Sequence, residues 1–235
     1  MILLYCMTEP NVEVTAAATG VRGGAVTSLT EEGSTGGLRC FYSDSDLTNT
    51  SQHTNQIAVD AMEFDAVIRG IFKDVAVIPF RFMTAMGTLE ELRGFLKQNA
   101  DEYAAELARI RSKTQMEVRI TAKQAPRPAG EGLSGTEFLK SKQENSQAVE
   151  EAAEKFIATC PNAEWKRRPS PDGSRLYALI EREALAGAEN FSQAAAKVDV
   201  GPEFNVRISG PWPATEFINC YAELQKSVAS ASAKK

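Results

Sequence analysis

The chain has 235 residues, of which 43% are hydrophobic and 24% charged, and this composition excludes global disorder and favours a globular protein of two modest domains. Its formal net charge of −5 disfavours a broad surface for nucleic acid or anionic membrane and leaves room only for a local basic patch. No C-x-x-C pair occurs among Cys6, Cys40, Cys160 and Cys220, so we expect reduced, mostly buried thiols rather than disulfides.

The N-terminal stretch MILLYCMTEP predicts a buried strand. It has no basic start and its apolar run stops at Met7, so it is too short for a signal peptide or a membrane span. We therefore expect a soluble, cytoplasmic protein. The single histidine, His53, lies in a polar stretch without clustered cysteines, so it is interpreted as a surface residue and not as part of a zinc site or a catalytic triad.

Residues 1–112 are predicted to form an α+β domain. AVTSLTE and LRCFYSD predict two short strands joined by GSTGG, and apolar residues at helical spacing between 56 and 72 predict a helix through Ile57, Phe64 and Ile71. VAVIPFRF (75–82) predicts a further strand. Thr88 and Glu91 form a capping box that starts a helix ending near Arg111.

Residues 113–226 are predicted to form a second domain with the element order βαββαβ, which is that of a ferredoxin-like fold. This fold occurs with many functions, so it does not indicate a particular one. Its expected elements are the strand TQMEVRITAK, a helix from the capping box of Ser134 and Glu137 to Cys160, a hairpin of AEWKRR and RLYALIE, the short helix FSQAAAKV and the strand FNVRISG. Arg119 and Arg207 occupy equivalent places in two strands, which is interpreted as common patterning and not as a repeat. Residues 227–235 are expected to be a disordered tail.

The sequence contains few motifs that are typical of catalytic or ligand-binding sites. GEGLSG (130–135) matches G-x-G-x-x-G, but it lies after a proline-rich loop, so a glycine-rich loop before a capped helix is preferred over a dinucleotide site. WKRR (165–168) could contact an anion, although a solvated strand end is preferred. No pair of carboxylates and no nucleophile with a base stands out, so no catalytic residue, cofactor or metal is predicted.

The stretch VAVIPFRF carries a proline and an arginine in an apolar run. Pro79 cannot donate to a ladder, so the strand lies at a sheet edge or ends near this residue. Alternation places Phe80 and Phe82 on one face and Arg81 on the other. An arginine on an apolar strand needs a partner, so Arg81 either joins elements through an internal ion pair, which is preferred, or binds a ligand.

The stretch GPWP near the C-terminus holds one aromatic side chain rigidly. Gly210 permits an unusual backbone angle, and Pro211 and Pro213 restrict the chain around Trp212. A tryptophan held in this way either fills a cleft between domains, which is preferred, or presents a recognition surface.

Four motifs in order resemble the GvpF/GvpL family of gas vesicle proteins over nearly the whole chain. They are LLYC (3–6), VIPFRFMT (77–84), SGTEFL (134–139) and GPWPATEF (210–217). In two places the chain departs from the family pattern: Met83 stands where the family usually has glycine, and Ala214-Thr215 replaces Pro-Tyr.

The resemblance implies two α+β domains and a non-enzymatic role in gas vesicles, the hollow protein shells that give microbes buoyancy. Such a protein is expected to bind the small hydrophobic shell protein through residues 1–112 and to assist nucleation or assembly of the vesicle in the cytoplasm. Other accessory proteins are expected as further partners, and nucleic acid and membrane are not. The resemblance also implies that Trp212 packs the C-terminal segment back onto the body and ties the domains together.

The candidate structural or interaction residues are therefore Pro79, Phe80, Arg81 and Phe82, with Gly210, Pro211, Trp212 and Pro213. Two alternative functions stay open. One is a small-ligand or nucleotide-binding enzyme that uses GEGLSG and the basic hairpin. The other is an oligomerising module with a purely structural role.

Overall fold

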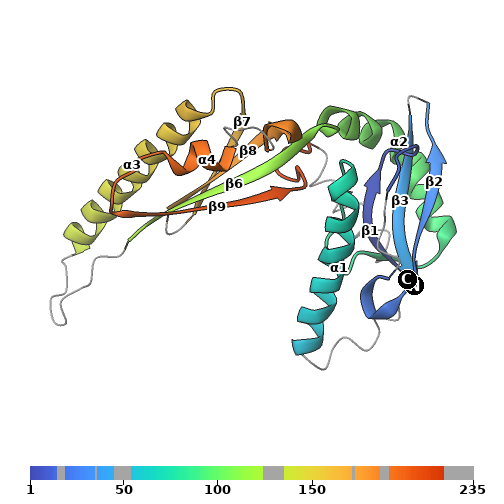
Figure 1. Cartoon of the computed structure of the whole chain (residues 1–235). Coiled ribbons are helices and arrows are strands. Elements are labelled where there is room, and N and C mark those ends of the chain that lie inside the picture. The colour runs from blue at the N-terminus through green and yellow to red at the C-terminus, as the bar shows by residue number, and fades with distance from the viewer. Residues whose placement is uncertain are drawn as a thin grey trace. The chain divides into compact units, whose positions relative to one another are not determined.

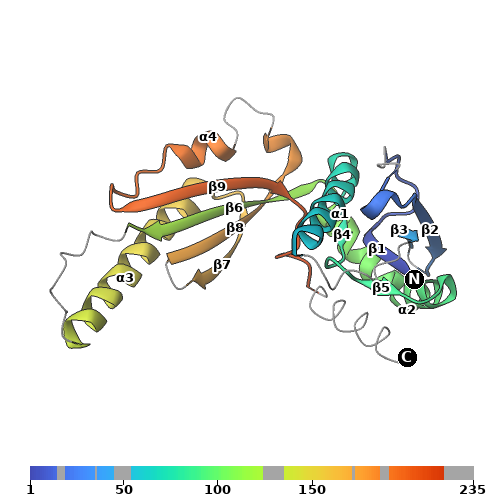
Figure 2. The ribbon, with the colours of Figure 1, turned by 90° about the horizontal axis from the view of Figure 1, so that it is seen from below.

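The computed structural model describes residues 1–14, 19–34, 36–44, 54–123, 135–170, 173–185 and 191–219. Within these ranges the protein is α+β, with two antiparallel sheets and four α-helices (Figures 1 and 2). Several sequence predictions lie outside the described residues: those for His53, for Cys220, for GEGLSG before Gly135, for the capping box of Ser134 with Glu137, and for the tail 227–235. The helix that was predicted to follow GEGLSG begins at Gly135.

The chain divides into two compact units. Among the described residues, the first contains Met1–Ser112 and also residues 213–219, and the second is Lys113–Trp212. The sequence prediction extended the second unit to residue 226, whereas in the structure it ends with the last strand at Trp212. The reason is that Ala214, Phe217 and Ile218 are buried in the first unit.

Among the described residues, the first unit is built on an antiparallel sheet with the strand order β2-β3-β1-β4, in which β5 also pairs with β1. The strands are β1 (Ile2–Thr8), β2 (Val26–Glu32), β3 (Gly37–Asp44), β4 (Ile78–Pro79) and β5 (Ala85–Met86). The register of β2 with β3 runs from the pair Val26–Ser43 to the pair Glu32–Gly37, which confirms the predicted hairpin.

Two helices, α1 (Thr54–Asp74) and α2 (Leu89–Ile110), cover the two faces of this sheet (Figures 1 and 2). All seven residues of β1 are therefore buried, which accounts for its continuous apolar run. Of the two hydrogen bonds in the predicted capping box of α2, one is formed as predicted. Thr88 accepts a hydrogen bond from the Glu91 backbone N–H at 3.1 Å, but the Glu91 carboxylate accepts from the Gly87 N–H at 2.8 Å.

The second unit has the element order β-α-β-β-α-β and the strand order β7-β8-β6-β9, with every pairing antiparallel. Its elements are β6 (Lys113–Ala122), α3 (Gly135–Thr159), β7 (Glu164–Ser170), β8 (Gly173–Glu181), the 3-10 helix η3 (Arg182–Leu185), α4 (Phe191–Ala196) and β9 (Phe204–Trp212). Helices α3 and α4 pack on one face of the sheet through Phe156 and Phe191, which share a core with Val118 and Leu176.

The cysteines are consistent with small buried hydrophobic residues. Cys6 and Cys40 are free and buried, and burial raises the pKa of both thiols. Cys160 is free and half-buried, and burial raises its pKa as well.

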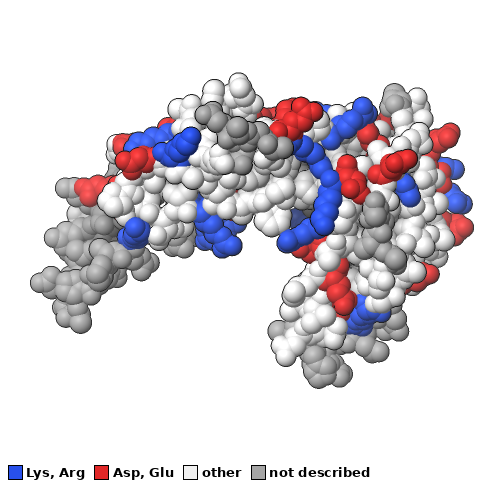
Figure 3. Space-filling view, viewed as in Figure 1, with Lys and Arg blue, Asp and Glu red and all other residues white. Residues whose placement is uncertain are grey.

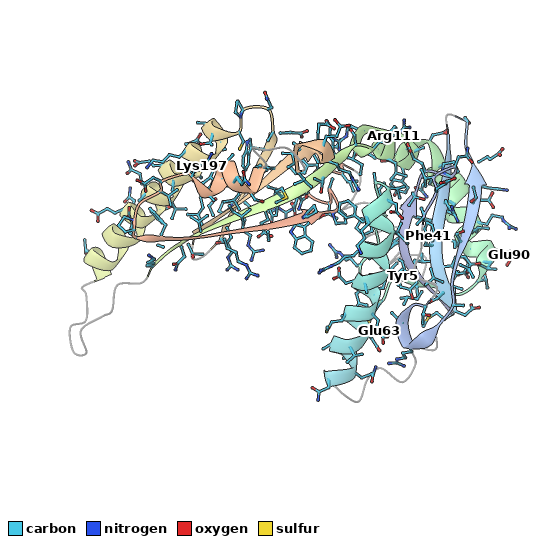
Figure 4. The ribbon with its side chains drawn as sticks, viewed as in Figure 1. Tyr5, Phe41, Glu63, Glu90, Arg111 and Lys197 are labelled. Atoms are coloured by element: carbon cyan, nitrogen blue, oxygen red, sulfur yellow. The ribbon has the colours of Figure 1, made fainter. Side chains whose placement is uncertain are left out.

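The tyrosine of LLYC fixes the loop between β1 and β2. Tyr5 lies on the face of the sheet turned toward α1, as Phe41 does (Figure 4). Its hydroxyl shares a hydrogen bond with Ser43 Oγ at 2.8 Å and accepts one from the Val21 N–H at 3.0 Å. A Cβ on Gly20 would lie 2.1 Å from the Tyr5 hydroxyl oxygen, so the loop needs glycine at this position.

A buried carboxylate ties the same loop to α1. Asp60 is fully buried and accepts from Arg22 Nη2 at 2.8 Å, from Arg22 Nε at 3.1 Å and from Gln56 Nε2 at 2.7 Å. The hydrogen bonds from Arg22 outweigh the effect of burial and lower the pKa of Asp60. Arg22 has a positive φ of 53°, and the Asp60 carboxylate holds it in this conformation.

We expect Asp60→Asn to lower the free energy of unfolding by about 1–3 kcal/mol at pH 7, because the mutation removes the charge that Arg22 binds. Since the pKa of Asp60 is lowered in the folded state, its contribution is present above the unfolded value of about 4 and is lost as the pH falls through the folded value. In urea unfolding, the difference in stability between wild type and variant should therefore shrink as the pH falls through the folded-state value. Asp65→Asn, which breaks only an exposed pair with Arg69, should change stability by less than about 0.5 kcal/mol. A loss at pH 7 that is equal in both variants would contradict this account.

Candidate functional site

The first candidate segment is the edge of the first sheet, where the structure corrects the predicted strand. Only Ile78–Pro79 of the stretch 75–82 is a strand, and the next strand begins at Ala85. The prediction that Pro79 lies at an edge or a strand end is confirmed, because β4 is the edge strand and ends there. Beyond Pro79 the chain makes one further bond to β1, from the Phe80 N–H to the Tyr5 carbonyl at 2.9 Å, and then turns.

The prediction that Phe80 and Phe82 share a face is wrong. The Phe80 ring packs against Phe95 of α2 with ring centroids 6.3 Å apart, and the Phe82 ring packs against Phe64 of α1 at 5.5 Å. The two side chains therefore reach the two helix layers on opposite sides of the sheet. The reason is that the backbone leaves the extended conformation after Phe80, so strand alternation no longer applies.

The internal ion pair predicted for Arg81 is not seen within the described residues. Arg81 is exposed, and its side chain makes no hydrogen bond or ion pair with any residue that the structure describes. The carbonyl of Arg81 accepts from the Thr84 N–H at 3.0 Å, which closes a β-turn over Arg81–Thr84. The turn leaves the Arg81 side chain exposed to solvent.

The third residue of this turn carries backbone strain. Met83 has a φ of 68°, in the left-handed region, and a turn with positive φ at its third position normally has glycine there. The glycine that the GvpF/GvpL pattern usually has at this place therefore has a physical reason. The Met83 side chain gains little in return, since it is 44% exposed.

The second candidate segment is the end of β9, where a bulge places an extra residue. Glu117 pairs with Ser209 and Gln115 pairs with Trp212, so two steps along β6 correspond to three along β9. The bulge contains Gly210, whose φ is 134°. A Cβ there would lie 2.6 Å from Met116 Sδ and 3.0 Å from the Gln115 carbonyl oxygen, so the position requires glycine.

The bulge decides which way Trp212 points. In regular alternation Trp212 would lie on the face covered by α3 and α4, but the extra residue returns it to the face of Ser209. The indole N–H donates to Ser209 Oγ at 3.4 Å, and Thr114 Oγ1 donates to the Trp212 carbonyl at 3.2 Å. The last strand thus continues through Pro211 to Trp212, two residues beyond the predicted end, and the side chain is half-buried.

The segment after Trp212 belongs to the first unit. Ala214, Phe217 and Ile218 are 2%, 1% and 5% exposed. Arg109 of α2 donates to the Phe217 carbonyl, and Glu106 accepts from the Asn219 side chain at 3.1 Å. Burial alone would raise the pKa of Glu106, but the hydrogen bonds and charge of Arg109, together with Asn219, lower it.

The two predicted motifs therefore lie in different units. Pro79, Phe80, Arg81 and Phe82 belong to the first unit, and Gly210, Pro211 and Trp212 to the second. Pro213 is the first residue of the segment that completes the first unit. The structure assigns a packing role to Phe80 and Phe82, a backbone role to Gly210, and an exposed position to Arg81.

One apolar surface was missed from the sequence. Val59, Met62 and Ala66 form a stripe on the exposed side of α1, and Met62 is 73% exposed. The residues recur at i, i+3 and i+7, opposite the buried Phe64 and Ile71, and this second periodicity was the available signal. Ile57, which was predicted to be on the buried face, is 40% exposed.

Two further kinds of feature, a metal-binding cluster and a membrane-spanning helix, do not occur within the described ranges. No group of three or more His, Cys, Asp or Glu side chains there could hold a metal ion. None of the helices in those ranges combines the length and the apolar character that crossing a membrane requires.

Comparison with known proteins gives a consistent assignment. A family model described as gas vesicle synthesis protein GvpL/GvpF matches residues 1–219. A search of curated proteins found no match. The fold resembles the crystal structure of the gas vesicle protein GvpF from Anabaena sp. PCC7120, with a TM-score of 0.67 and 16% identity over 93% of this chain and 95% of that one. It also resembles that of GvpF from Microcystis aeruginosa, with a TM-score of 0.67 and 15% identity over 93% and 98% of the two chains.

We expect Met83→Gly to raise the free energy of unfolding by up to about 1 kcal/mol, because glycine adopts the positive φ without a steric cost. Met83→Ala is the matched control, since it removes the same side chain but keeps the Cβ that causes the strain. Thermal unfolding should therefore rank the glycine variant above the alanine variant. Equal stability of the two would show that the turn is not strained.

We expect Gly210→Ala to lower the free energy of unfolding by about 1–3 kcal/mol, through the unfavourable φ and the contact with Met116 Sδ. Gly94→Ala is the control, because a Cβ at this helical position meets nothing within 4 Å and should be neutral or stabilising. Urea unfolding monitored by tryptophan fluorescence would measure both variants. A Gly210→Ala protein as stable as wild type would rule out the constraint at the bulge.

Proposed function

The chain belongs to the GvpL/GvpF family of gas vesicle synthesis proteins, and we propose that it is a non-enzymatic accessory or minor structural component that binds the small hydrophobic shell protein. In this role it assists nucleation or assembly of the vesicle in the cytoplasm. Its partners are the major shell protein and other accessory proteins of the vesicle. Family membership alone names neither the partner nor the mode of action, and both are what we propose here.

The distribution of exposed apolar side chains carries this proposal. Among the described residues, seven large hydrophobic side chains are exposed, and six of them lie in the first unit: Met1, Ile57, Val59, Met62, Met83 and Leu89. The seventh, Val206, lies in the second unit. Contiguous exposed apolar side chains mark an interaction surface, and three of these six lie within one stretch of α1, so α1 of the first unit is where a hydrophobic partner would bind.

The stripe of Val59, Met62 and Ala66 is the candidate contact within that unit. A surface helix is normally polar on its solvent side, whereas α1 carries Val59, Met62 and Ala66 on the exposed side of its first half. The stripe can accept an apolar helix or strand of the shell protein and hide it from water before polymerisation. The exposed Arg81 and Met83 of the β-turn provide a second place in the same unit, at the edge of the sheet, where the partner can bind.

The proposed fold of the second unit is ferredoxin-like. Its element order and its strand order β7-β8-β6-β9, with two helices on one face, support this assignment. The fold on its own names no function, and the proposal for the shell protein rests on the first unit.

The test is co-purification of the tagged full-length protein with co-expressed shell protein. A Val59→Asp/Met62→Glu variant should recover about tenfold less shell protein, because it places carboxylates where an apolar surface would bind. Val206→Glu is the matched control and should leave recovery unchanged. Since Arg81 is exposed, Arg81→Ala should not change stability, and a lower recovery with this variant would place the turn in the contact.

The whole chain is used because residues 1–112 alone lack the buried Phe217 of the first unit. Wild-type recovery by the Val59→Asp/Met62→Glu variant would exclude the stripe as the contact. Failure of the folded wild-type protein to recover any shell protein would overturn the proposed function.

A further inference from the structure

The second unit has a polar sheet face whose role the proposed function does not explain. Helices α3 and α4 cover the face that carries Val118 and Leu176. We call the opposite face the open face, although Tyr177 and Leu179, nearer Trp212 on this face, are buried. Strand alternation places Arg119, Arg175 and Arg207 on it. Figure 3 shows Lys and Arg side chains gathered on the side of this sheet away from α3 and α4.

The strand register aligns these arginines into one row across the sheet. Arg168 of β7 pairs with Arg175 of β8, Arg175 pairs with Arg119 of β6, and Arg119 pairs with Arg207 of β9. Since neighbouring strands lie about 4.8 Å apart, the four residues span about 14 Å. We call Arg168, Arg175, Arg119 and Arg207 the arginine row.

The neighbouring rows do little to neutralise this charge. On one side lie Lys166, Tyr177, Glu117 and Ser209, and on the other Ser170, Gly173, Thr121 and Asn205. Glu117 is the carboxylate in these rows, and its oxygen is 3.9 Å from Arg175 Nε, at the limit of an ion pair. Within the two neighbouring rows as the structure describes them, one carboxylate and one further lysine therefore lie beside the four arginines.

Two of the arginines have unused hydrogen-bonding capacity. Arg119 Nε is buried and has no hydrogen-bond partner among the described residues. Arg207 is exposed, and the described part of the chain provides it with no hydrogen bond or ion pair. Like charges directly opposite each other on a sheet are destabilising, and at these two positions no hydrogen bond or ion pair with a described residue offsets that cost.

We propose that the arginine row is a docking surface for a carboxylate-rich segment of a protein partner. A planar guanidinium binds a carboxylate through two parallel hydrogen bonds, and a row of four offers this geometry repeatedly. Charge complementarity thus selects an acidic partner. The surface lies in the second unit and differs in chemistry from the apolar stripe on α1, so the inference is independent of shell-protein binding.

Nucleic acid fits the open face less well. Sequence-tolerant binding of single strands uses exposed aromatic rings on which bases stack. The aromatic residue in the row next to the arginines, Tyr177, is 6% exposed, and Trp212 lies two rows away and is half-buried. The face therefore offers charge without a stacking platform beside it.

The test is a titration of the full-length protein with a fluorescent polyglutamate peptide, followed by anisotropy. Wild type should bind in low salt and lose affinity as salt screens the charges. An Arg119→Gln/Arg207→Gln variant should bind at least about tenfold more weakly. Its melting temperature in low salt should equal or exceed that of wild type, because two of four neighbouring like charges are gone.

Arg69→Gln/Arg93→Gln is the matched control, since it removes the same charge from helices of the first unit and should bind like wild type. The proposal is overturned if wild type does not bind the peptide or if the control loses affinity equally. Tighter binding of a thymidine oligonucleotide than of polyglutamate would overturn the class of partner. A dimer in light scattering that the Arg119→Gln/Arg207→Gln variant abolishes would instead identify a second copy of the chain as the occupant.

Discussion

The first unit depends on a short segment that the chain reaches only after the second unit is complete. Phe217 is 1% exposed, and Arg109 and Glu106 of α2 bind the segment through the Phe217 carbonyl and Asn219. The residue at which β9 ends therefore determines both where the last strand of the second unit stops and where the segment that completes the first unit begins. The bulge at Gly210 and the pairing of Trp212 with Gln115 set that residue, which explains why glycine, prolines and tryptophan occur together here.

A second constraint acts at the edge of the first sheet. Pro79 ends β4, the chain makes a tight turn, and β5 rejoins β1 at Ala85. This interruption shortens the exposed edge, which is one way in which proteins avoid uncontrolled strand pairing. It also lets Phe80 and Phe82 enter the cores on opposite sides of the sheet while Arg81 stays in solvent. The stretch 75–82 looks like one strand in the sequence, but in the structure it contacts the sheet and both helices of the unit.

The two units present different surfaces to partners. Exposed apolar side chains gather in the first unit, and the arginine row crosses the open face of the second. Apolar contact supplies affinity in proportion to buried area, whereas guanidinium groups supply specificity for anions and sensitivity to salt. In the function that we propose, the first kind of surface binds the shell protein and the second binds an acidic partner.

The amino-acid sequence alone determined the elements that depend on local periodicity and turn chemistry. The β2-β3 hairpin, the helices α1 and α2 and the edge position of Pro79 were predictable, because spacing, caps and the missing proline N–H act within a few residues. The family also followed from four short motifs. The exposure of Arg81, the direction of Trp212 and the alignment of four arginines were decided only by the tertiary structure. Each depends on a turn, a bulge or a strand register, and a change of one residue in any of these moves a side chain to the other face.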